Sequence, residues 1–248
     1  LSWKIPVYAH IPLIHGIDGG KLSKRHGALG VDSYSEQGFL PEAMLNYLLR
    51  LGWSHGDKEI ISRKEAIDLF NLESIGRSSA KFDLERLSSL NAVYINGTEN
   101  VKLAALVKEI YSSKSIDIDN KKLLLIENGM SGIKARARTI NELAEMCSFY
   151  IETSPISLDS KSKKVLNSDN IKLLENYSNS LNSVDNWNQL NIEENIKIYC
   201  KNNNINLGKL AQPLRAATTG KSVSPGLYEV MEVLGKKETL NRITNINN

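Results

Sequence analysis

The stretch GGKLSKRHG, residues 19–27, gathers groups that could act on phosphate. Two glycines precede Lys21, Lys24 and Arg25, and glycine permits tight turns and close approach of the backbone to a ligand. Three cations could surround a triphosphate and neutralise its charge while an inner phosphorus is attacked and pyrophosphate leaves. Lysine suits this task because it carries a compact charge on a flexible stem. Taken alone, such a stretch is also typical of a solvated turn, so the surrounding sequence must decide.

Other arrangements that could do chemistry are missing from the sequence. Cys147 and Cys200 stand far apart, in no metal-ligand or disulfide spacing, and we expect both to be buried or half-buried thiols. The four histidines form no HxxxH-type pair, so the sequence does not indicate a zinc site. No GxxxxGK[ST] motif follows the glycines, and no paired-carboxylate or Ser/His/Asp arrangement is supported by spacing.

Composition is that of a soluble globular protein, with 248 residues, 41% hydrophobic and 24% charged. No apolar run approaches the roughly 18 residues of a transmembrane helix, and the start LSWKIPVYAH lacks the regions of a signal peptide. We therefore expect a cytoplasmic protein with no membrane partner. Because the first residue is Leu1 and not methionine, we also expect a piece of a longer chain.

The net charge of +3 is distributed unevenly. Residues 1–100 hold 11 Lys and Arg against 12 Asp and Glu, whereas residues 101–248 hold 20 against 16. A basic face in the second part is compatible with phosphate contacts, and equally with a solvated helical surface.

The elements that must position these groups are mostly helices. GFLPEAMLNYLLRLGWS, residues 38–54, predicts a buried helix with Pro41 in its first turn and Gly52 as its stop. Its expected apolar face comprises Ala43, Met44, Leu45, Leu48, Leu49 and Leu51.

Local end signals mark further helices. Ser62–Glu65 is a capping box that opens a helix through Phe70, and Thr139–Glu142 opens another. Ser224–Pro225 reads as an N-cap beside a first-turn proline. Pro213 predicts a kinked helix or two abutting ones.

One segment after the extended start has the composition of a strand, namely AVYIN, residues 92–96. Two polar stretches, residues 96–100 and 152–164, read as loops. They divide the chain into three expected domains, residues 1–98, 99–151 and 152–248.

Several longer motifs share a resemblance. KLSKRHG resembles the lysine-rich signature loop, commonly KMSKS, of class I aminoacyl-tRNA synthetases in the form carried by bacterial glutamyl-tRNA synthetases. VDSYSEQGFLPEAMLNYLLRLGWS, FDLERLSSLN, PLRAATTG and SPGLYEVMEVLGKKETLNRI resemble the same family, in the same order and at about the expected separations. The resemblance covers nearly the whole chain and is weakest between residues 96 and 211.

The resemblance implies a fold that is mainly α. It implies the end of a Rossmann-like catalytic fold with the signature loop and a stem-contact domain (1–98), followed by two all-α anticodon-binding helical subdomains (99–151 and 152–248). Nothing in the sequence matches the HIGH-type motif of the amino-terminal half, so the chain resembles the carboxy-terminal half of glutamate–tRNA ligase. Alone, it is expected to form no glutamyl-adenylate.

The same resemblance implies roles for the loop. Lys21 and Lys24 take the positions of the signature lysines, with Lys24 as the catalytic residue that steadies the ATP phosphates, and Arg25 adds support. ATP and Mg²⁺ belong to the complete enzyme, with none expected tightly bound to this chain. Glutamate and ATP would be reached through the missing half, tRNA(Glu) is the expected partner, and we expect a monomer. The alternative is a free-standing, non-catalytic tRNA-binding or assembly module that keeps the loop.

Recognition of RNA is the remaining chemistry, because unpaired anticodon bases can be stacked and hydrogen-bonded along their edges. In glutamyl-tRNA synthetases that discriminate the glutamate from the glutamine anticodon, an arginine reads the third anticodon base. Arg136 in KARARTINEL is the counterpart by resemblance, with Arg138 as the alternative. A helix-terminal surface arginine would look the same.

A second anticodon surface is indicated by PLRAATTGKSVSPG, residues 213–226. Here Arg215, Thr218, Thr219 and Lys221 lead from a helix into a basic, hydroxyl-rich loop whose backbone amides could meet phosphate or base edges. Arg215 could equally be a structural ion-pair partner. The sequence leaves open whether the enzyme also charges glutamine tRNA.

Overall fold

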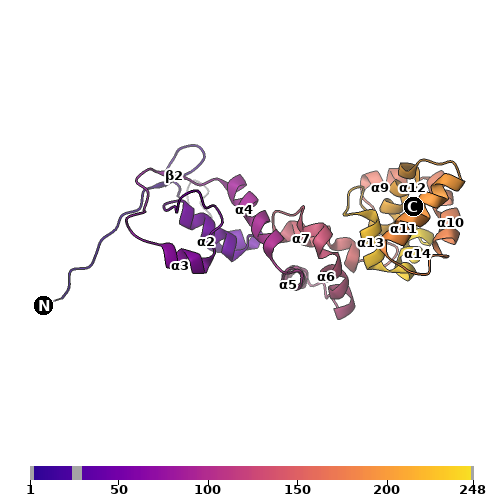
Figure 1. Ribbon diagram of the computed structural model, residues 1–248, viewed down its shortest axis with the longest axis horizontal. Coiled ribbons are helices and arrows are strands. Elements are labelled where there is room, and N and C mark those ends of the chain that lie inside the picture. The colour runs from indigo at the N-terminus through magenta and orange to yellow at the C-terminus, as the bar shows by residue number, and fades with distance from the viewer. Residues whose placement is uncertain (1–2, 24–29, 247–248) are drawn as a thin grey trace. The chain divides into compact units, whose positions relative to one another are not determined.

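The structure is a computed structural model that describes residues 3–23 and 30–246. It is mainly helical, as the sequence predicts, and the chain divides into two compact units. Unit 1 holds the chain up to Thr98 together with Ala137–Asn141, and unit 2 holds Glu99–Arg136 together with the chain from Glu142 onward. Figure 1 traces the elements of both along the chain.

Unit 1 combines a small parallel sheet with helices. In the sheet, Ile14 pairs with Ala80 and His15 with Lys81. The elements are β1 (Ile14–His15), α1 (Val31–Glu36), α2 (Pro41–Arg50), α3 (Arg63–Leu69), β2 (Ala80–Lys81) and α4 (Leu84–Gly97).

Helix α2 begins at Pro41 in the first turn and is followed by Leu51 and Gly52, which confirms its predicted ends. Its buried face differs in part from the prediction, because Leu45 and Leu48 are 52% and 42% exposed. Asn46 and Tyr47 are buried in addition to the expected Ala43 and Met44.

The buried polar residues of α2 are accommodated because their polar atoms are bonded. The Asn46 side chain donates to the Glu59 carbonyl (3.0 Å) and accepts from the Ile61 amide (2.9 Å). The Tyr47 hydroxyl donates to the Asp83 carbonyl (2.9 Å) and accepts from the Asp83 amide (2.6 Å).

The strand predicted at residues 92–96 is wrong, because this segment is the second half of α4. Asp83 caps α4 by accepting from the Glu85 amide (2.9 Å), and the buried Leu87, Asn91 and Ile95 recur every four residues. That helical spacing extends through AVYIN, so packing of one face overrides the local β-propensity.

The Ala137–Asn141 segment completes unit 1. The Asn91 side chain accepts from the Leu40 amide (2.8 Å) and donates to the Arg138 carbonyl (2.7 Å). The Ile140 amide donates to the Gly38 carbonyl (2.9 Å).

Unit 2 is built from helices in every described element. These are α5 (Asn100–Ser113), α6 (Asn120–Lys134), α7 (Ile140–Met146, whose first two residues belong to unit 1), α8 (Ser148–Ile151), α9 (Ser160–Val165), α10 (Ser168–Leu181), α11 (Gln189–Asn202), α12 (Leu207–Thr219), α13 (Leu227–Leu234) and α14 (Lys236–Thr244).

The ends of the helices in both units confirm some predictions and correct others. The capping box at Ser62–Glu65 is formed, and α7 begins beside Thr139 as predicted. The expected loop at 152–164 instead contains α9, and α13 begins at Leu227 after Gly226 in place of Pro225. Pro213 lies inside the single helix α12, so of the two predicted alternatives, a kinked helix or two abutting ones, the second is wrong.

One apolar core of unit 2 surrounds α12. Each fully buried leucine or isoleucine there contributes about 1.5–3 kcal/mol. Its fully buried members are Leu174, Tyr177, Leu181, Ile192, Ile196, Leu210, Leu214 and Met231. Because α12 packs against α9, α10, α11, α13 and α14, the point where its last turn gives way to a loop is fixed by the core.

Among the described residues, no helix combines the length and the hydropathy needed to cross a bilayer.

Candidate functional site

The approach to the lysine-rich stretch is a tight turn. The Gly16 amide donates to the Gly20 carbonyl (2.8 Å), and Gly19 takes a positive φ of 80°. Lys21 then forms an antiparallel bridge with His15, at the end of β1. The exposed Lys21 is thereby anchored to the sheet through its backbone, whereas Lys24 and Arg25 lie outside the described residues.

In unit 2, two of the arginines singled out from the sequence meet at one turn. Arg136 Nη1 donates to the Ser224 carbonyl at 2.7 Å. Arg215 Nη1 donates to the same carbonyl at 3.1 Å and to the Pro225 carbonyl at 2.7 Å. It also donates to the Ser224 hydroxyl. The Ser224–Pro225 turn is therefore held by two guanidinium groups.

This geometry corrects the predicted N-cap at Ser224. Its hydroxyl is used by Arg215, nine residues earlier in the chain, and is not the cap of α13. Arg215 was considered above as a structural ion-pair partner. Its acceptors here are instead uncharged oxygens of a turn.

The two guanidinium groups create a positively charged site. Burial, reinforced by the neighbouring positive charge of Arg136, lowers the pKa of Arg215. A guanidinium carries five N–H donors, and the bond from Arg136 to the Ser224 carbonyl uses one of them. The site can therefore offer donors to an anionic or acceptor-rich ligand.

A pocket of about 300 Å³ opens beside this turn. Arg136 and Lys221 supply positive charge, Glu142 and Glu145 supply carboxylate acceptors, and the rest of the wall is largely apolar. The lining residues are Ile133, Arg136, Glu142, Glu145, Met146, Phe149, Lys221, Val223, Ser224 and Pro225. Donors and acceptors around an apolar wall are what the edge and face of a nucleobase require.

Two predicted contact residues support the loop from inside. Thr218 and Thr219 are buried, at 0% and 1% exposure. The Thr218 hydroxyl donates to the Leu214 carbonyl (2.7 Å), and the Thr219 hydroxyl donates to the Arg215 carbonyl (2.7 Å). The Thr219 hydroxyl also accepts from the Lys221 amide (3.2 Å), so it holds the backbone of a pocket residue.

Arg138, the alternative to Arg136, belongs to unit 1. Its Nη1 lies 3.0 Å from Glu85 Oε2, and the two side chains are 54% and 83% exposed. The structure thus gives the two neighbouring arginines different partners, and only Arg136 lines the pocket of unit 2.

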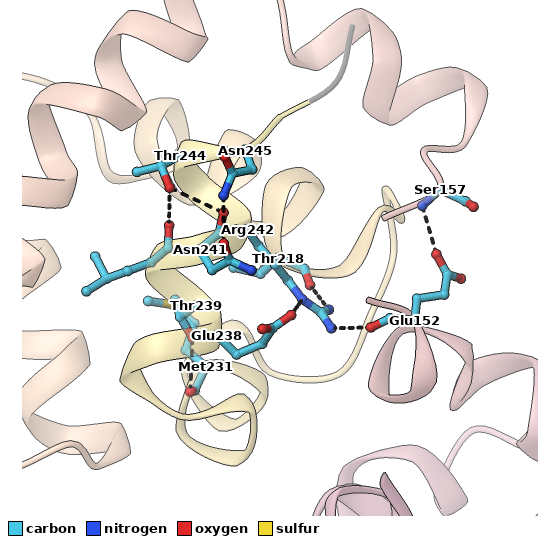
Figure 2. Close-up of polar contacts among 11 residues, drawn as sticks. Glu152, Ser157, Thr218, Met231, Glu238, Thr239, Asn241, Arg242, Thr244 and Asn245 are labelled. Atoms are coloured by element: carbon cyan, nitrogen blue, oxygen red, sulfur yellow. Dashed lines mark hydrogen bonds and ion pairs between the residues drawn. The ribbon is translucent and has the colours of Figure 1, made fainter. Parts of the chain in front are cut away.

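Sequence reasoning missed a buried arginine behind the loop. Arg242 donates through Nη1 to the Thr218 carbonyl (2.7 Å) and through Nη2 to the Glu152 carbonyl (3.0 Å). Its Nε lies 2.7 Å from Glu238 Oε1 (Figure 2). The i,i+4 spacing of Glu238 and Arg242 was a readable signal of an ion pair, but nothing local indicated that Arg242 would be buried.

Asp159 was missed as well. The sequence predicted that it lies in a polar loop. In the structure it is the N-cap of α9, and its side chain also accepts from the Ser222 amide at 2.8 Å. The aspartate directly before SKSKKV was the available signal for the cap, whereas its bond across 63 residues had none.

Family models match both parts of the chain. Residues 102–247 match the anticodon binding domain, and residues 1–89 match the model described as tRNA synthetases class I (E and Q), catalytic domain.

Individual relatives match along almost the whole chain. It is 46% identical over 244 residues to glutamate–tRNA ligase 2 of Rhodospirillum rubrum, covering 98% of this chain and 52% of the relative. It is 42% identical over 250 residues to glutamate–tRNA ligase of Bradyrhizobium diazoefficiens, covering 98% and 53%. The crystal structure of a glutamate tRNA ligase from Elizabethkingia meningosepticum matches with a TM-score of 0.81 and 28% identity, over 97% of this chain and 51% of that one. The chain thus spans about half the length of these relatives.

Proposed function

Because the chain belongs to the glutamate–tRNA ligase family of class I tRNA synthetases, we propose that it supplies the tRNA-binding part of such a ligase, together with the signature loop. The complete protein would activate glutamate with ATP and transfer it to tRNA(Glu). In this division of labour, unit 2 binds the anticodon, and unit 1 carries the loop that meets the ATP phosphates.

The observation that carries the proposal is the pocket of unit 2, where Arg136, Lys221 and the Ser224–Pro225 turn come together. A splayed base has hydrogen-bonding groups on its edge and an apolar face, and the pocket offers partners for both. Arg215 also holds this turn by donating to the Ser224 and Pro225 carbonyls.

Arg136 is proposed to read the third anticodon base. If that base is cytosine, its carbonyl oxygen and ring nitrogen both accept hydrogen bonds, and a guanidinium can donate to both in one plane. Lys221 would meet phosphate or a base edge, while Thr218 and Thr219 would shape the loop from within. The bond from Arg136 to the Ser224 carbonyl limits the orientations of the guanidinium before RNA arrives.

For unit 1, we propose that Lys21 and Lys24 face the ATP phosphates in the complete enzyme, with Lys24 closest to the reaction and Arg25 beside it. Support comes from the anchoring of Lys21 to β1 and from the family match over residues 1–89. Among residues 3–23 and 30–246, no group of three or more His, Cys, Asp or Glu side chains could hold a metal ion. We propose that Mg²⁺ acts in the complete enzyme only and is coordinated there by the nucleotide phosphates, which is a common mode of binding for this ion.

We also propose that the chain from residue 99 onward comprises two helical subdomains, residues 99–151 and 152–248, and that the first of them lends Ala137–Asn141 to unit 1. Support comes from the core around α12, whose buried members run from Leu166 to Ile243 and so belong to the second of them.

The experiment is a binding titration of the 248-residue chain with three RNAs. These are a tRNA(Glu) transcript, the same transcript with its third anticodon base changed, and an unrelated hairpin, each at low and near-physiological salt. The base change is expected to cost about 1 kcal/mol or more in the chain and nothing in Arg136→Ala, as for loss of a specific base contact. A salt dependence shared by all three RNAs would report phosphate contacts.

Arg138→Ala is the matched control, because it removes the same side chain two positions away at an exposed ion pair. It should keep the discrimination. Loss of discrimination in Arg138→Ala alone would move the reading role to Arg138. Equal affinity of the unchanged chain for all three RNAs would refute anticodon reading.

A further inference from the structure

The loop that carries Lys221 is fastened on both sides of that residue by one aspartate. The Asp159 amide donates to the Gly220 carbonyl at 2.8 Å. The Asp159 Oδ2 atom accepts from the Ser222 amide, also at 2.8 Å. Lys221 therefore lies between two residues whose backbones are tied to Asp159.

The other carboxylate oxygen of Asp159 has a separate task. Oδ1 accepts from the Ser162 amide at 2.6 Å and so caps α9. Burial would raise the pKa of this carboxyl, but the bonds from Ser162 and Ser222 outweigh burial and hold the pKa well below its usual range. The residue is thus charged at neutral pH, and each oxygen receives one backbone N–H.

The segment that carries Asp159 also lies directly against the loop. Gly220 has a φ of +68°, and a Cβ atom built on it would stand 2.0 Å from the Ser157 carbonyl oxygen. The Ser157 amide in turn donates to Glu152 Oε2 at 2.8 Å. Two stretches of chain more than 60 residues apart are therefore in contact at this point.

Arg242 bonds to the residues from which both stretches begin, the loop that carries Lys221 and the segment that leads to Asp159. Its guanidinium bonds the Thr218 carbonyl, just before the loop, and the Glu152 carbonyl, at the start of the segment that leads to Asp159. Figure 2 shows Arg242 between these two carbonyls, with Glu152 also reaching Ser157. With the base of the loop bonded in this way, the Asp159 contacts act on its tip together with the bond from the Lys221 amide to the Thr219 hydroxyl.

We propose that Asp159 is a positioning residue for anticodon reading, acting by clamping Gly220 and Ser222 so that Lys221 and Ser224 hold their places at the pocket. This inference rests on the function proposed above. Ser224 provides the carbonyl to which Arg136 donates, so the clamp sets both the lysine and, through the turn, the arginine. A loop ordered before binding does not have to be ordered at the expense of affinity when RNA binds.

The sharpest variant is Asp159→Asn. Asparagine is a good N-cap, so its oxygen can keep the bond from Ser162. Its NH₂ group would then face the Ser222 amide, and two donors cannot bond each other. The Ser222 contact of the clamp is broken, while the cap of α9 and the backbone bond from the Asp159 amide to the Gly220 carbonyl remain. Asp159→Ala serves as a second variant that loses both side-chain contacts.

Asp119→Asn is the matched control. Asp119 caps α6 in the same unit by accepting from the Lys122 amide at 2.8 Å, a bond within its own helix. Thermal unfolding of both variants should be measured first, and binding should be compared at a temperature where both are folded.

Two readouts test the proposal in the 248-residue chain. Hydrogen exchange of the Ser222 amide, followed by NMR, should speed up about tenfold or more in Asp159→Asn, because local opening frees that amide. The ratio of affinities for the tRNA(Glu) transcript and its base-changed version should fall from about tenfold towards one, since about 1.4 kcal/mol of discrimination corresponds to tenfold. Asp119→Asn should change neither.

The outcomes separate the two ideas. An unchanged Ser222 exchange rate in both Asp159 variants would overturn the clamp itself. Faster exchange with full discrimination retained would overturn the positioning role while leaving the proposed function standing. No discrimination in the unchanged chain would refute the proposed function, and the positioning role with it.

Discussion

At Gly220 a missing side chain makes room for another part of the chain. Replacement by alanine should lower the free energy of unfolding of unit 2 by more than the roughly 1–2 kcal/mol that a left-handed φ costs an L-residue. The reason is that the new Cβ would meet the Ser157 carbonyl oxygen at 2.0 Å and force the two stretches apart. Urea unfolding followed by circular dichroism measures the loss.

Gly56→Ala provides the comparison. Gly56 also has a positive φ, of 54°, but a Cβ there meets nothing within 4 Å. The decrease in the free energy of unfolding caused by Gly56→Ala should not exceed the cost of the left-handed backbone conformation, roughly 1–2 kcal/mol. Equal losses at Gly220 and Gly56 would show that the contact with Ser157 carries no energetic weight.

The choice between Arg136 and Arg138 shows the limit of sequence at the scale of a residue. Both stand in KARARTINEL, two positions apart, with the same chemistry. What separates them is tertiary: Arg136 reaches a carbonyl 88 residues further on, and Arg138 an acidic side chain 53 residues earlier. Local pattern carries no signal for partners at such distances.

Among the helices, α14 is secured through Arg242. Its side chain is 2% exposed, and Arg242→Met should destabilise unit 2 by about 3 kcal/mol or more, because the Thr218 and Glu152 carbonyls and the Glu238 carboxylate lose a common partner. The urea midpoint is the measurement.

Lys197→Met is the control for this change. Lys197 and Glu193 form another i,i+4 pair, 2.8 Å apart, but their side chains are 60% and 36% exposed. An exposed pair contributes about 0–1 kcal/mol. Comparable losses in the two variants would contradict a special role for the buried arginine.

The capping box of α3 should make the stability of unit 1 depend on pH in acid. A hydrogen bond from Lys58, followed by bonds from Ser62, lowers the pKa of Glu65 to about 2, against about 4.3 in an unfolded chain. Because the folded pKa is the lower one, the stabilisation is complete above about pH 4.3 and is lost as the pH falls towards 2.

NMR titration of the Glu65 carboxyl should give that midpoint directly. The difference in stability between the unchanged chain and Glu65→Gln should shrink over the same interval. A Glu65 midpoint near 4.3 would mean that the box does not hold its charge in solution.

How far elements could be predicted depended on how local their signals were. The capping box at Ser62 and the first-turn Pro41 of α2 act within one helical turn, and both were correctly predicted. AVYIN was assigned to a strand because its five residues favour β-structure locally. The helical spacing of the buried Leu87, Asn91 and Ile95 extends beyond this five-residue window, so the window does not reveal it. The start of α13 was predicted too early because Arg215 donates to the Ser224 hydroxyl, which therefore does not cap the helix.

For the molecule as a whole, the path of the chain between the units matters. The chain leaves unit 1 after Thr98, returns for Ala137–Asn141, and leaves again. A polypeptide of residues 1–98 would lose the Arg138 carbonyl, which accepts from the buried Asn91, and the Ile140 amide, which donates to Gly38. Unit 1 should then be less stable by about 1–3 kcal/mol, the usual result of leaving a buried polar group without its partner.

Fluorescence of the buried Trp53 during urea unfolding would follow unit 1 once Trp3 and, in the 248-residue chain, Trp187 of unit 2 are replaced by phenylalanine. Residues 1–141, which keep the returning segment, should restore part of the loss. Identical midpoints for residues 1–98 and the 248-residue chain would show that the segment is dispensable.

The two buried cysteines have a practical consequence for separating the units. Cys147 and Cys200 are 0% and 5% exposed, both lie in unit 2, and burial raises the pKa of Cys147 to about 12. A thiol-reactive dye modifies the thiolate, so neither sulfur should be labelled until unit 2 opens. Labelling rates therefore measure the opening of unit 2 in any variant, and unit 1, which contains no cysteine, contributes no background.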